Sequence, residues 1–255
     1  MKKLKNISKL VMLFGLLSVF SCSEVEPLDP AIVLNPNPTD PNNPNNPGNP
    51  GTSTGDYWPA ELNNQWVFER NGVTQQPMKM VSINSIDGHT YYTFASQTGT
   101  GQNGTTGSAV TRLRKEGADY YMRVEEFTTE PSPGVPGSVT TGTETIILRD
   151  DLPVGGTWTS SYNQTTTYSD PLYPVITINY AITGTIMEKG VEVTVGDVVY
   201  TDVIKSKFVQ NVTMMGQTQV ATTYYWFAKD IGPIRMLTES DLGDYDSLLV
   251  SYIVN

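Results

Sequence analysis

The stretch VITINYAITGTIM, Val175 to Met187, decides the fold class of this chain. Its large apolar residues recur at every second position, and polar or small residues fill the positions between them: the apolar set is Ile176, Ile178, Tyr180, Ile182 and Ile186. Successive side chains of a β-strand point to opposite faces of the sheet. The pattern therefore predicts a strand that buries one face and exposes the other to solvent.

Further strand patterns, separated by turn signals, lie on both sides of this stretch. Asp87-Gly88 separates KMVSINSI from HTYYTFAS, and Asp-Gly favours a type I′ hairpin because both central residues need a positive φ. Three more turns and two long strands are expected on the same grounds: Glu116–Asp119, Gly196-Asp197, Met215-Gly216, Val198–Gln210 and Thr218–Ala228. The sequence predicts an all-β domain, an antiparallel meander of about ten to twelve strands that forms a curved sheet, open barrel or sandwich.

The first 21 residues have the features of a signal peptide. Four lysines precede an apolar run from Leu10 to Phe20, and Ser21 is the small residue before the expected cleavage site. The run is too short to span a bilayer as a helix, which needs about 20 apolar residues. We therefore expect residues 1–21 to direct export.

Cys22, the one cysteine in 255 residues, follows this segment directly. Val19-Phe20-Ser21-Cys22 resembles a bacterial lipobox, and Ser23-Glu24-Val25-Glu26 resembles the acidic signal of surface-exposed lipoproteins of Bacteroidota. The resemblance implies that Cys22 carries lipid chains such as palmitate, which would anchor the protein in a membrane. It implies the outer membrane and the cell surface, with the periplasmic face as the alternative. A single cysteine also excludes an internal disulfide.

A segment without apolar periodicity separates Cys22 from the strand-rich part of the chain. Residues 22–56 include PNPTDPNNPNNPGNP, whose prolines favour extended backbone and whose composition cannot bury enough surface to fold. We expect these residues to form a disordered linker. Residues 57–255 are then a single β-rich domain that the linker holds away from the membrane.

The charge of the chain limits its partners. The whole chain carries 16 basic and 26 acidic residues, a net charge of −10. Without the four lysines of residues 1–21, the balance is 12 basic against 26 acidic residues, or −14. This composition argues against nucleic acid, whose affinity for proteins comes mainly from neutralised phosphates. It also argues against electrostatic attachment to anionic lipid, so membrane association must come from the lipid on Cys22.

Two aromatic segments of the domain extend the family resemblance. DYWPAELNNQWVFE and YYWFAKDIGPIRM are similar to segments of uncharacterised cell-envelope lipoproteins of Bacteroidota. In that group a glycine usually occupies the position of Asn63 or Asn64 in this chain. The resemblance implies a lipid-anchored envelope protein, and it brings no activity, catalytic residue or cofactor with it.

Four consecutive aromatic residues are the strongest candidates for a ligand site. Alternation along a strand places Tyr224 and Trp226 on one face and Tyr225 and Phe227 on the other. One face must belong to the core. If the other is exposed, its rings could stack on a sugar or peptide or line an apolar groove. Burial of both faces by the protein itself is the alternative.

The acidic segment ESDLGDYDS, residues 239–247, carries two weaker candidates. Asp241, Asp244 and Asp246 offer the hard oxygen ligands that Ca²⁺ prefers, although their spacing differs from that of an EF-hand. A solvated hairpin loop is the alternative. Asp246-Ser247-Leu248 resembles the Asp-Ser/Thr-aliphatic O-glycosylation motif of Bacteroidota, which implies modification of Ser247.

Two glycine motifs and the single histidine lack the context that their chemistry needs. GTSTG, residues 51–55, lies in the expected linker rather than between a strand and a helix. GTGQNG, residues 99–104, precedes loop and strand residues rather than a helix. His89 follows a hairpin turn. The sequence therefore indicates no catalytic residue, no resident metal and no cofactor.

These observations favour a non-enzymatic, lipid-anchored envelope protein whose β-domain binds a glycan, peptide, lipid or partner protein. The alternative is a hydrolase of envelope or extracellular polymers that uses carboxylates. A cleft with two carboxyl groups about 5–10 Å apart would favour the hydrolase. A chiefly structural role is a third hypothesis, which a packed domain without a cavity would favour.

Overall fold

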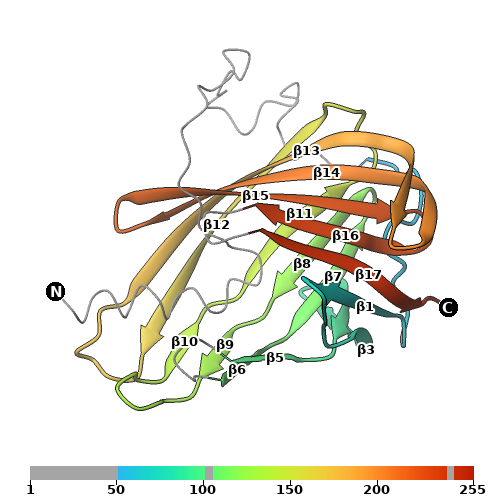
Figure 1. Cartoon of the computed structure of the whole chain (residues 1–255). Helices are drawn as coiled ribbons and strands as arrows, with labels where there is room; N and C mark the ends of the chain where they lie inside the picture. Colours follow the sequence, from blue (N-terminus) through green and yellow to red (C-terminus); the bar gives the residue numbers. More distant parts are fainter. Residues whose placement is uncertain (1–50, 101–105, 240–243) are drawn as a thin grey trace.

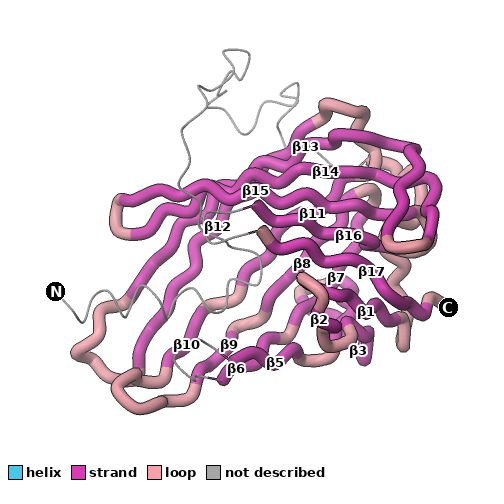
Figure 2. The backbone as a smooth tube through the Cα atoms, in the orientation of Figure 1, coloured by secondary structure: helices cyan, strands magenta, loops and turns pink. Residues whose placement is uncertain are grey.

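The computed structural model describes residues 51–100, 106–239 and 244–255 (Figures 1 and 2). Within these ranges the regular secondary structure is seventeen β-strands, and no helix there is long and apolar enough to cross a membrane. The first nine strands are β1 (Gln65–Arg70), β2 (Val73–Thr74), β3 (Met78–Ile86), β4 (His89–Phe94), β5 (Gln97–Thr100), β6 (Thr106–Ala109), β7 (Thr111–Glu116), β8 (Asp119–Val124) and β9 (Phe127–Thr129). The other eight are β10 (Ser138–Thr140), β11 (Thr143–Arg149), β12 (Thr157–Tyr168), β13 (Ile176–Val195), β14 (Val198–Met214), β15 (Gln217–Ala228), β16 (Gly232–Glu239) and β17 (Tyr245–Ile253).

The strands form one antiparallel sheet that curves back on itself and stays open (Figure 1). From β12 to β17 each strand pairs with the next, and β17 pairs with β1, so the two ends of the domain lie side by side. The order continues from β1 through β3, β4, β7 and β8 to β11. No ladder joins β11 to β12 in the described residues, although β10 pairs with both β9 and β12. The predicted all-β antiparallel class is confirmed.

The number of strands exceeds the expected ten to twelve because several strands are short or interrupted. β2 has two residues, and β9 and β10 have three each. β9 follows β8 after two residues, and β11 follows β10 after two residues. Two chain segments that each bend once, β8–β9 and β10–β11, are therefore counted as four strands. Such a bend interrupts the backbone pairing without interrupting the alternation of apolar residues in the sequence.

The stretch that predicted the fold forms the first half of β13, whose burial follows the predicted alternation. Ile176, Ile178, Tyr180, Ile182 and Ile186 are all buried. The predicted turns are also present: Asp87 and Gly88 have φ of 52° and 83°, and Met215 and Gly216 have φ of 50° and 77°. These values are those that type I′ hairpins require at both central positions.

The main core lies inside the curve of the sheet and is built around tryptophans. Trp58 comes from the segment before β1, and its ring centroid lies 6.1 Å from that of Trp66, 5.9 Å from Phe94 and 6.0 Å from Phe227. Trp66 is fully buried, and its Nε1 donates a hydrogen bond to the carbonyl of Ile231 at 2.7 Å. The N-terminal segment therefore fills the interior and ties together β1, β4 and β15.

A third buried tryptophan, Trp158 of β12, links β12 to β11. Trp158 is buried, its Nε1 donates to the carbonyl of Ile146 at 3.2 Å, and its ring packs edge-on against Phe208 at 5.6 Å. Gly184 pairs with Trp158 across β12 and β13. A Cβ at Gly184 would lie 2.2 Å from the indole ring, so the ring occupies the space that a larger residue would need.

The folded part of the chain begins before the expected boundary at residue 57. Asp150 is fully buried and accepts hydrogen bonds from Ser53 Oγ at 2.6 Å and from the Thr54 N–H at 3.0 Å. Asp56 Oδ1 lies 2.6 Å from Lys115 Nζ. Residues 51–56, which the sequence assigns to the linker, therefore lie on the domain. The polar residues that indicated a linker instead donate hydrogen bonds to the buried carboxylate of Asp150, which is distant in the sequence.

The contact between Trp158 and Gly184 gives a stability prediction. Gly184→Ala should destabilise the domain by about 1–3 kcal/mol, because the indole is held by its hydrogen bond and by Phe208 and cannot move aside freely. Urea unfolding followed by circular dichroism measures the change. Ala181→Val adds volume on the exposed face of the same strand and should leave the midpoint almost unchanged. Equal effects of the two substitutions would contradict the inference that the Trp158 indole fills the space beside Gly184.

Candidate functional site

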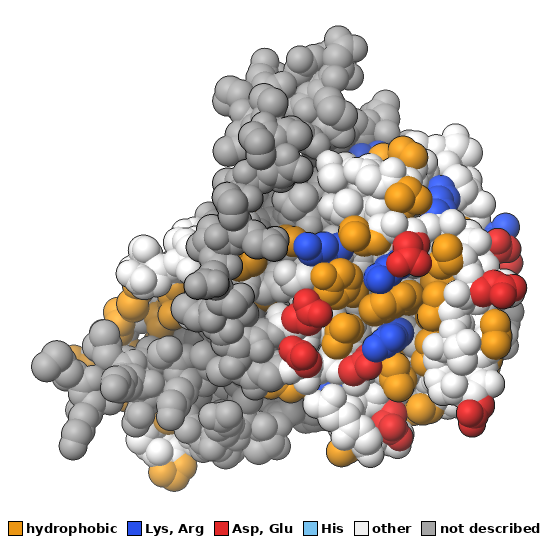
Figure 3. All heavy atoms as spheres, turned by 45° about the horizontal axis from the view of Figure 1, so that its top comes forward, with side chains coloured by type: hydrophobic (Ala, Val, Ile, Leu, Met, Phe, Trp, Pro, Cys, Tyr) orange, Lys and Arg blue, Asp and Glu red, His pale blue; other side chains and the backbone are white. Residues whose placement is uncertain are grey.

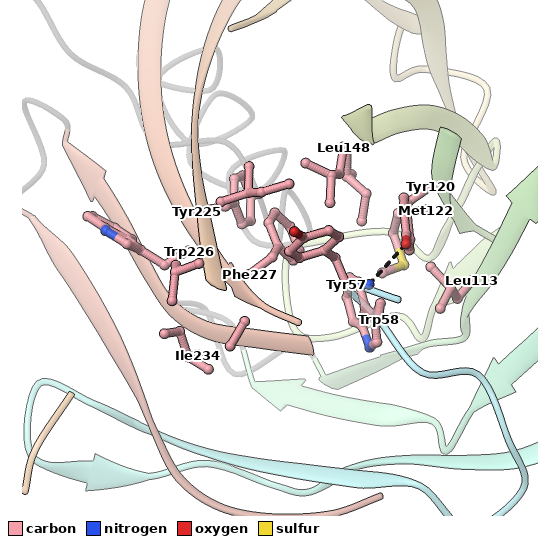
Figure 4. Close-up of a cluster of buried hydrophobic side chains, with 14 of the residues drawn as sticks. Tyr57, Trp58, Leu113, Tyr120, Met122, Leu148, Tyr225, Trp226, Phe227 and Ile234 are labelled. Carbon is pink, nitrogen blue, oxygen red and sulfur yellow. Dashed lines mark hydrogen bonds between the residues drawn. The ribbon is translucent and has the colours of Figure 1, made fainter. Parts of the chain in front are cut away.

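The predicted aromatic residues lie on β15 and divide between its two faces as expected. Tyr225 and Phe227 face the core, with their rings stacked at 5.8 Å between centroids. Figure 4 shows Phe227 directed toward Trp58 and Trp226 directed to the other side of the strand. Trp226 is nevertheless only 7% exposed, while Tyr224 is half-buried. Of the four rings, Tyr224 is the one that leaves most of its surface open to a ligand.

Cations cover Trp226 on the outer face of the sheet. Lys205 Nζ lies 5.2 Å from the centroid of the Trp226 ring and 5.7 Å from that of Tyr224. The guanidinium carbon of Arg235 lies 4.9 Å from the Trp226 centroid. These distances permit cation–π attraction, which holds the rings in a fixed arrangement. We call Tyr224, Trp226, Lys205, Lys207 and Arg235 the outer row.

Carboxylates balance most of the positive charge of the outer row. Glu188 accepts a hydrogen bond from Lys205 at 3.2 Å, and Asp246 accepts two from Arg235 at 3.0 and 2.8 Å. Lys207 lies directly opposite Tyr224 in the ladder and has no ion pair within the described ranges. Figure 3 shows basic, acidic and hydrophobic side chains interspersed on the outer face of the molecule. Among the cations of the outer row, the ammonium of Lys207, beside Tyr224, is thus the one that carboxylates of the described residues leave unpaired.

Of the three candidate metal ligands, the structure describes Asp244 and Asp246. Asp241 lies outside the described residues. The carboxylate of Asp246 accepts hydrogen bonds from Arg235. The backbone carbonyl of Asp244 accepts a hydrogen bond from the Asn71 side-chain amide at 3.4 Å. The described residues contain no group of three or more His, Cys, Asp or Glu side chains arranged to hold a metal ion.

Of the two candidate modification sites, the structure describes Ser247 alone. Ser247 is 2% exposed and accepts a hydrogen bond from Arg70 Nε at 3.1 Å, so its glycosylation would have to precede folding. Cys22 lies outside the described residues. Both modifications remain predictions of the sequence.

The glycine motifs and His89 show no catalytic arrangement in the described residues. Ser53 of the GTSTG motif bonds to Asp150 and to the carbonyl of Gly55, and His89 lies elsewhere, with Nδ1 3.8 Å from Glu116. The GTGQNG motif overlaps residues that the structure does not describe. The residues that precede and follow that gap belong to the hairpin strands β5 and β6, not to a helix.

Arg70 is a residue of interest that the sequence analysis did not identify. It ends β1, is half-buried, and pairs with Ser247 across the ladder to β17. Its one side-chain hydrogen bond within the described part of the chain goes to Ser247, and its side chain has no carboxylate partner there. No local motif marks it, because its isolation depends on where all the acidic residues lie in the folded protein.

The interior contains tyrosines whose ionisation is suppressed. Burial raises the pKa of Tyr120, Tyr162 and Tyr225 well above the ordinary value of 10.0. The Asp150 carboxylate also raises the pKa of Tyr120, whose hydroxyl donates to Asp150 Oδ2 at 3.1 Å. Desolvation disfavours the phenolate, so these groups stay neutral and act as packing and hydrogen-bonding groups near neutral pH.

Comparison with known proteins identifies no family and no activity. No family model matches the chain, and no curated protein matches it. Two solved structures are similar over 78% of this chain and 99% of theirs, each with a TM-score of 0.47. One is a protein of Bacteroides fragilis described as exported and as having a YmcC-like fold, at 10% identity; the other is from Parabacteroides distasonis, described as a lipoprotein, at 11% identity. A TM-score below 0.5 supports no statement about activity or ligand.

The buried tyrosines give a prediction about alkaline stability. Because their pKa is higher in the folded state, their contribution to stability is complete below about pH 10 and declines as the pH rises toward the folded-state values. The urea midpoint should therefore be flat from pH 7 to about 9 and fall above about pH 10. Unfolding curves at several pH values, with phenolate absorbance at 295 nm, measure both effects. A midpoint that rises above pH 10 would contradict the assignment.

Proposed function

We propose that the chain is a non-enzymatic, lipid-anchored protein of the cell envelope whose β-domain binds an envelope glycan through the outer row. The linker and the lipid on Cys22 would hold the domain at the outer membrane, on the cell surface. The observation that supports glycan binding is the half-exposed Tyr224 ring beside Lys207, which has no ion pair in the described residues. A sugar ring can stack on an aromatic face while its hydroxyl groups accept hydrogen bonds from an adjacent ammonium.

The rigidity of the outer row supports its use as a binding surface. Trp226 is fixed between Lys205 and Arg235, and its ring lies 6.3 Å from Tyr224. Strands β14 and β15, which carry Lys205, Lys207, Tyr224 and Trp226, are long and pair without a register shift, so these side chains need little ordering when a ligand binds. Less ordering lowers the entropic cost of association.

The pairing of Glu116 and Glu144 supports a binding role over hydrolysis. Both carboxylates contact Arg114 and thus share a permanent positive charge. A glycosidase needs one carboxyl group that stays protonated as a general acid, and a nearby guanidinium favours the ionised form. Burial raises the pKa of Asp119 despite its ion pair with Arg149, but Asp119 is only 1% exposed and is not open to a substrate.

The lipid anchor can be tested by metabolic labelling with a clickable fatty acid. Wild-type protein should become labelled and Cys22→Ala should not, because Cys22 is the single cysteine available for acylation. Protease treatment of intact cells then tests surface exposure, since a surface domain should be digested. Equal labelling of the two proteins would exclude the anchor, and complete protection from protease would place the domain on the periplasmic side.

Glycan binding can be tested with the full chain carrying Cys22→Ala and a panel of outer-membrane and capsular polysaccharides. Tyr224→Ala should weaken binding by about tenfold or more, a typical effect of removing a central aromatic contact. Thr222→Ala, two residues away on the same face of β15, is the matched control and should bind as wild type. Binding that survives Tyr224→Ala, or hydrolysis of a polysaccharide by the wild type, would overturn the proposal.

A further inference from the structure

Arg70 is the exception among the six arginines of the chain. The other five each lie within 4.0 Å of a carboxylate: Arg112, Arg114, Arg123, Arg149 and Arg235. Arg70 has no such partner in the described residues, although the chain contains 26 acidic residues. A half-buried guanidinium has five N–H donors, and only Nε has a partner, Ser247 Oγ.

The strand register places Arg70 on the inner face of the sheet. Trp66 belongs to the core, and Phe68 and Arg70 follow it at alternate positions of β1. Across the sheet, Arg70 pairs with Ser247, Ser247 with Met236, and Met236 with Tyr225. Directly paired residues share a face, so Arg70 lies at the end of an inner row that leads to the buried Tyr225.

Carboxylates near this row are directed elsewhere. Asp246 precedes Ser247 in β17 and therefore points to the outer face, where Arg235 binds it with two hydrogen bonds. Glu69 precedes Arg70 and likewise belongs to the outer face. The adjacent positions thus cannot neutralise the guanidinium from within the sheet.

The inner row combines this cation with accessible apolar surface. Phe68 and Met236 are half-buried and pack against the main core, so part of each remains open. Farther along the row, Ser206 is fully buried opposite Tyr225, and its Oγ has no hydrogen-bond partner in the described residues. Unpaired buried polar groups are rare in folded proteins.

We propose that this inner row is a second binding site, separate from the outer row, for an anionic amphiphile: a long-chain carboxylate of the fatty-acid type. The carboxylate would accept hydrogen bonds from the free guanidinium N–H groups of Arg70, a bidentate geometry that arginine favours. The acyl chain would lie against Phe68 and Met236. A free acid sugar would leave this apolar surface uncovered, which is why the acyl chain is the better match.

The experiment titrates sodium dodecanoate into the full chain carrying Cys22→Ala, by calorimetry and below the micellar concentration. Dodecanol and acetate are the comparison probes, because they carry the chain without the charge and the charge without the chain. Arg70→Gln should weaken dodecanoate binding by about tenfold or more, as expected when a charge-assisted bidentate contact is lost. Lys79 lies opposite Gln65 in the ladder between β1 and β3, on the other face of the sheet from Arg70. Lys79→Gln also removes one positive charge, and its affinity for dodecanoate should stay within about twofold of wild type.

A second measurement does not depend on the folding of the Arg70 variant. Among the six arginines, Arg70 should react fastest with phenylglyoxal because no carboxylate of the described residues pairs with its guanidinium, and dodecanoate should protect it. Mass spectrometry after partial modification gives the rate at each site. The proposal is wrong if dodecanoate does not bind, if dodecanol or acetate binds as tightly, if Arg70→Gln has no effect, or if dodecanoate leaves the modification of Arg70 unchanged.

Discussion

The packing of Trp58 between Trp66, Phe94 and Phe227 is the interaction on which the rest of the fold depends. It brings an irregular N-terminal segment into contact with β1, β4 and β15, which lie in different halves of the sheet. A curved sheet that stays open on one side cannot bury its inner face by closure alone. A large side chain from outside the sheet fills that interior, and the main core gathers around it. The pairing of β1 with β17 then places both ends of the domain beside this core.

Local patterns in the sequence were sufficient for the fold class and for many of the turns. The alternation in β13 and the Asp87-Gly88 turn depend on neighbouring residues, and the structure reproduces both. The position of residues 51–56 could not be read in the same way, because it depends on Asp150, about a hundred residues away. The polar composition of that segment fits a solvated linker and a hydrogen-bonded segment equally well.

The candidate site shows the same division between local and distant information. Alternation assigned Tyr224 and Trp226 to one face of β15 and Tyr225 and Phe227 to the other, as found. The sequence did not indicate that Lys205 and Arg235 would cover Trp226, since both come from neighbouring strands whose register is set by tertiary pairing. Arg70 was missed for a related reason: that it has no ion pair among the described residues is a property of the whole fold, and no motif encodes it.

The hydrogen bonds between residues 51–56 and the domain determine where a mechanical load applied through the N-terminal segment would enter the domain. Tension on the N-terminal side would act first on the bonds of Ser53 and Thr54 to Asp150, together with the ion pair of Asp56 and Lys115. Just beyond them the Tyr57 N–H donates to Tyr120, which itself contacts Asp150. Such tension would thus be carried by the polar contacts of Ser53, Thr54 and Asp56 beside β8 and β11. Trp58 and the hydrophobic interior would be loaded only after those contacts had broken.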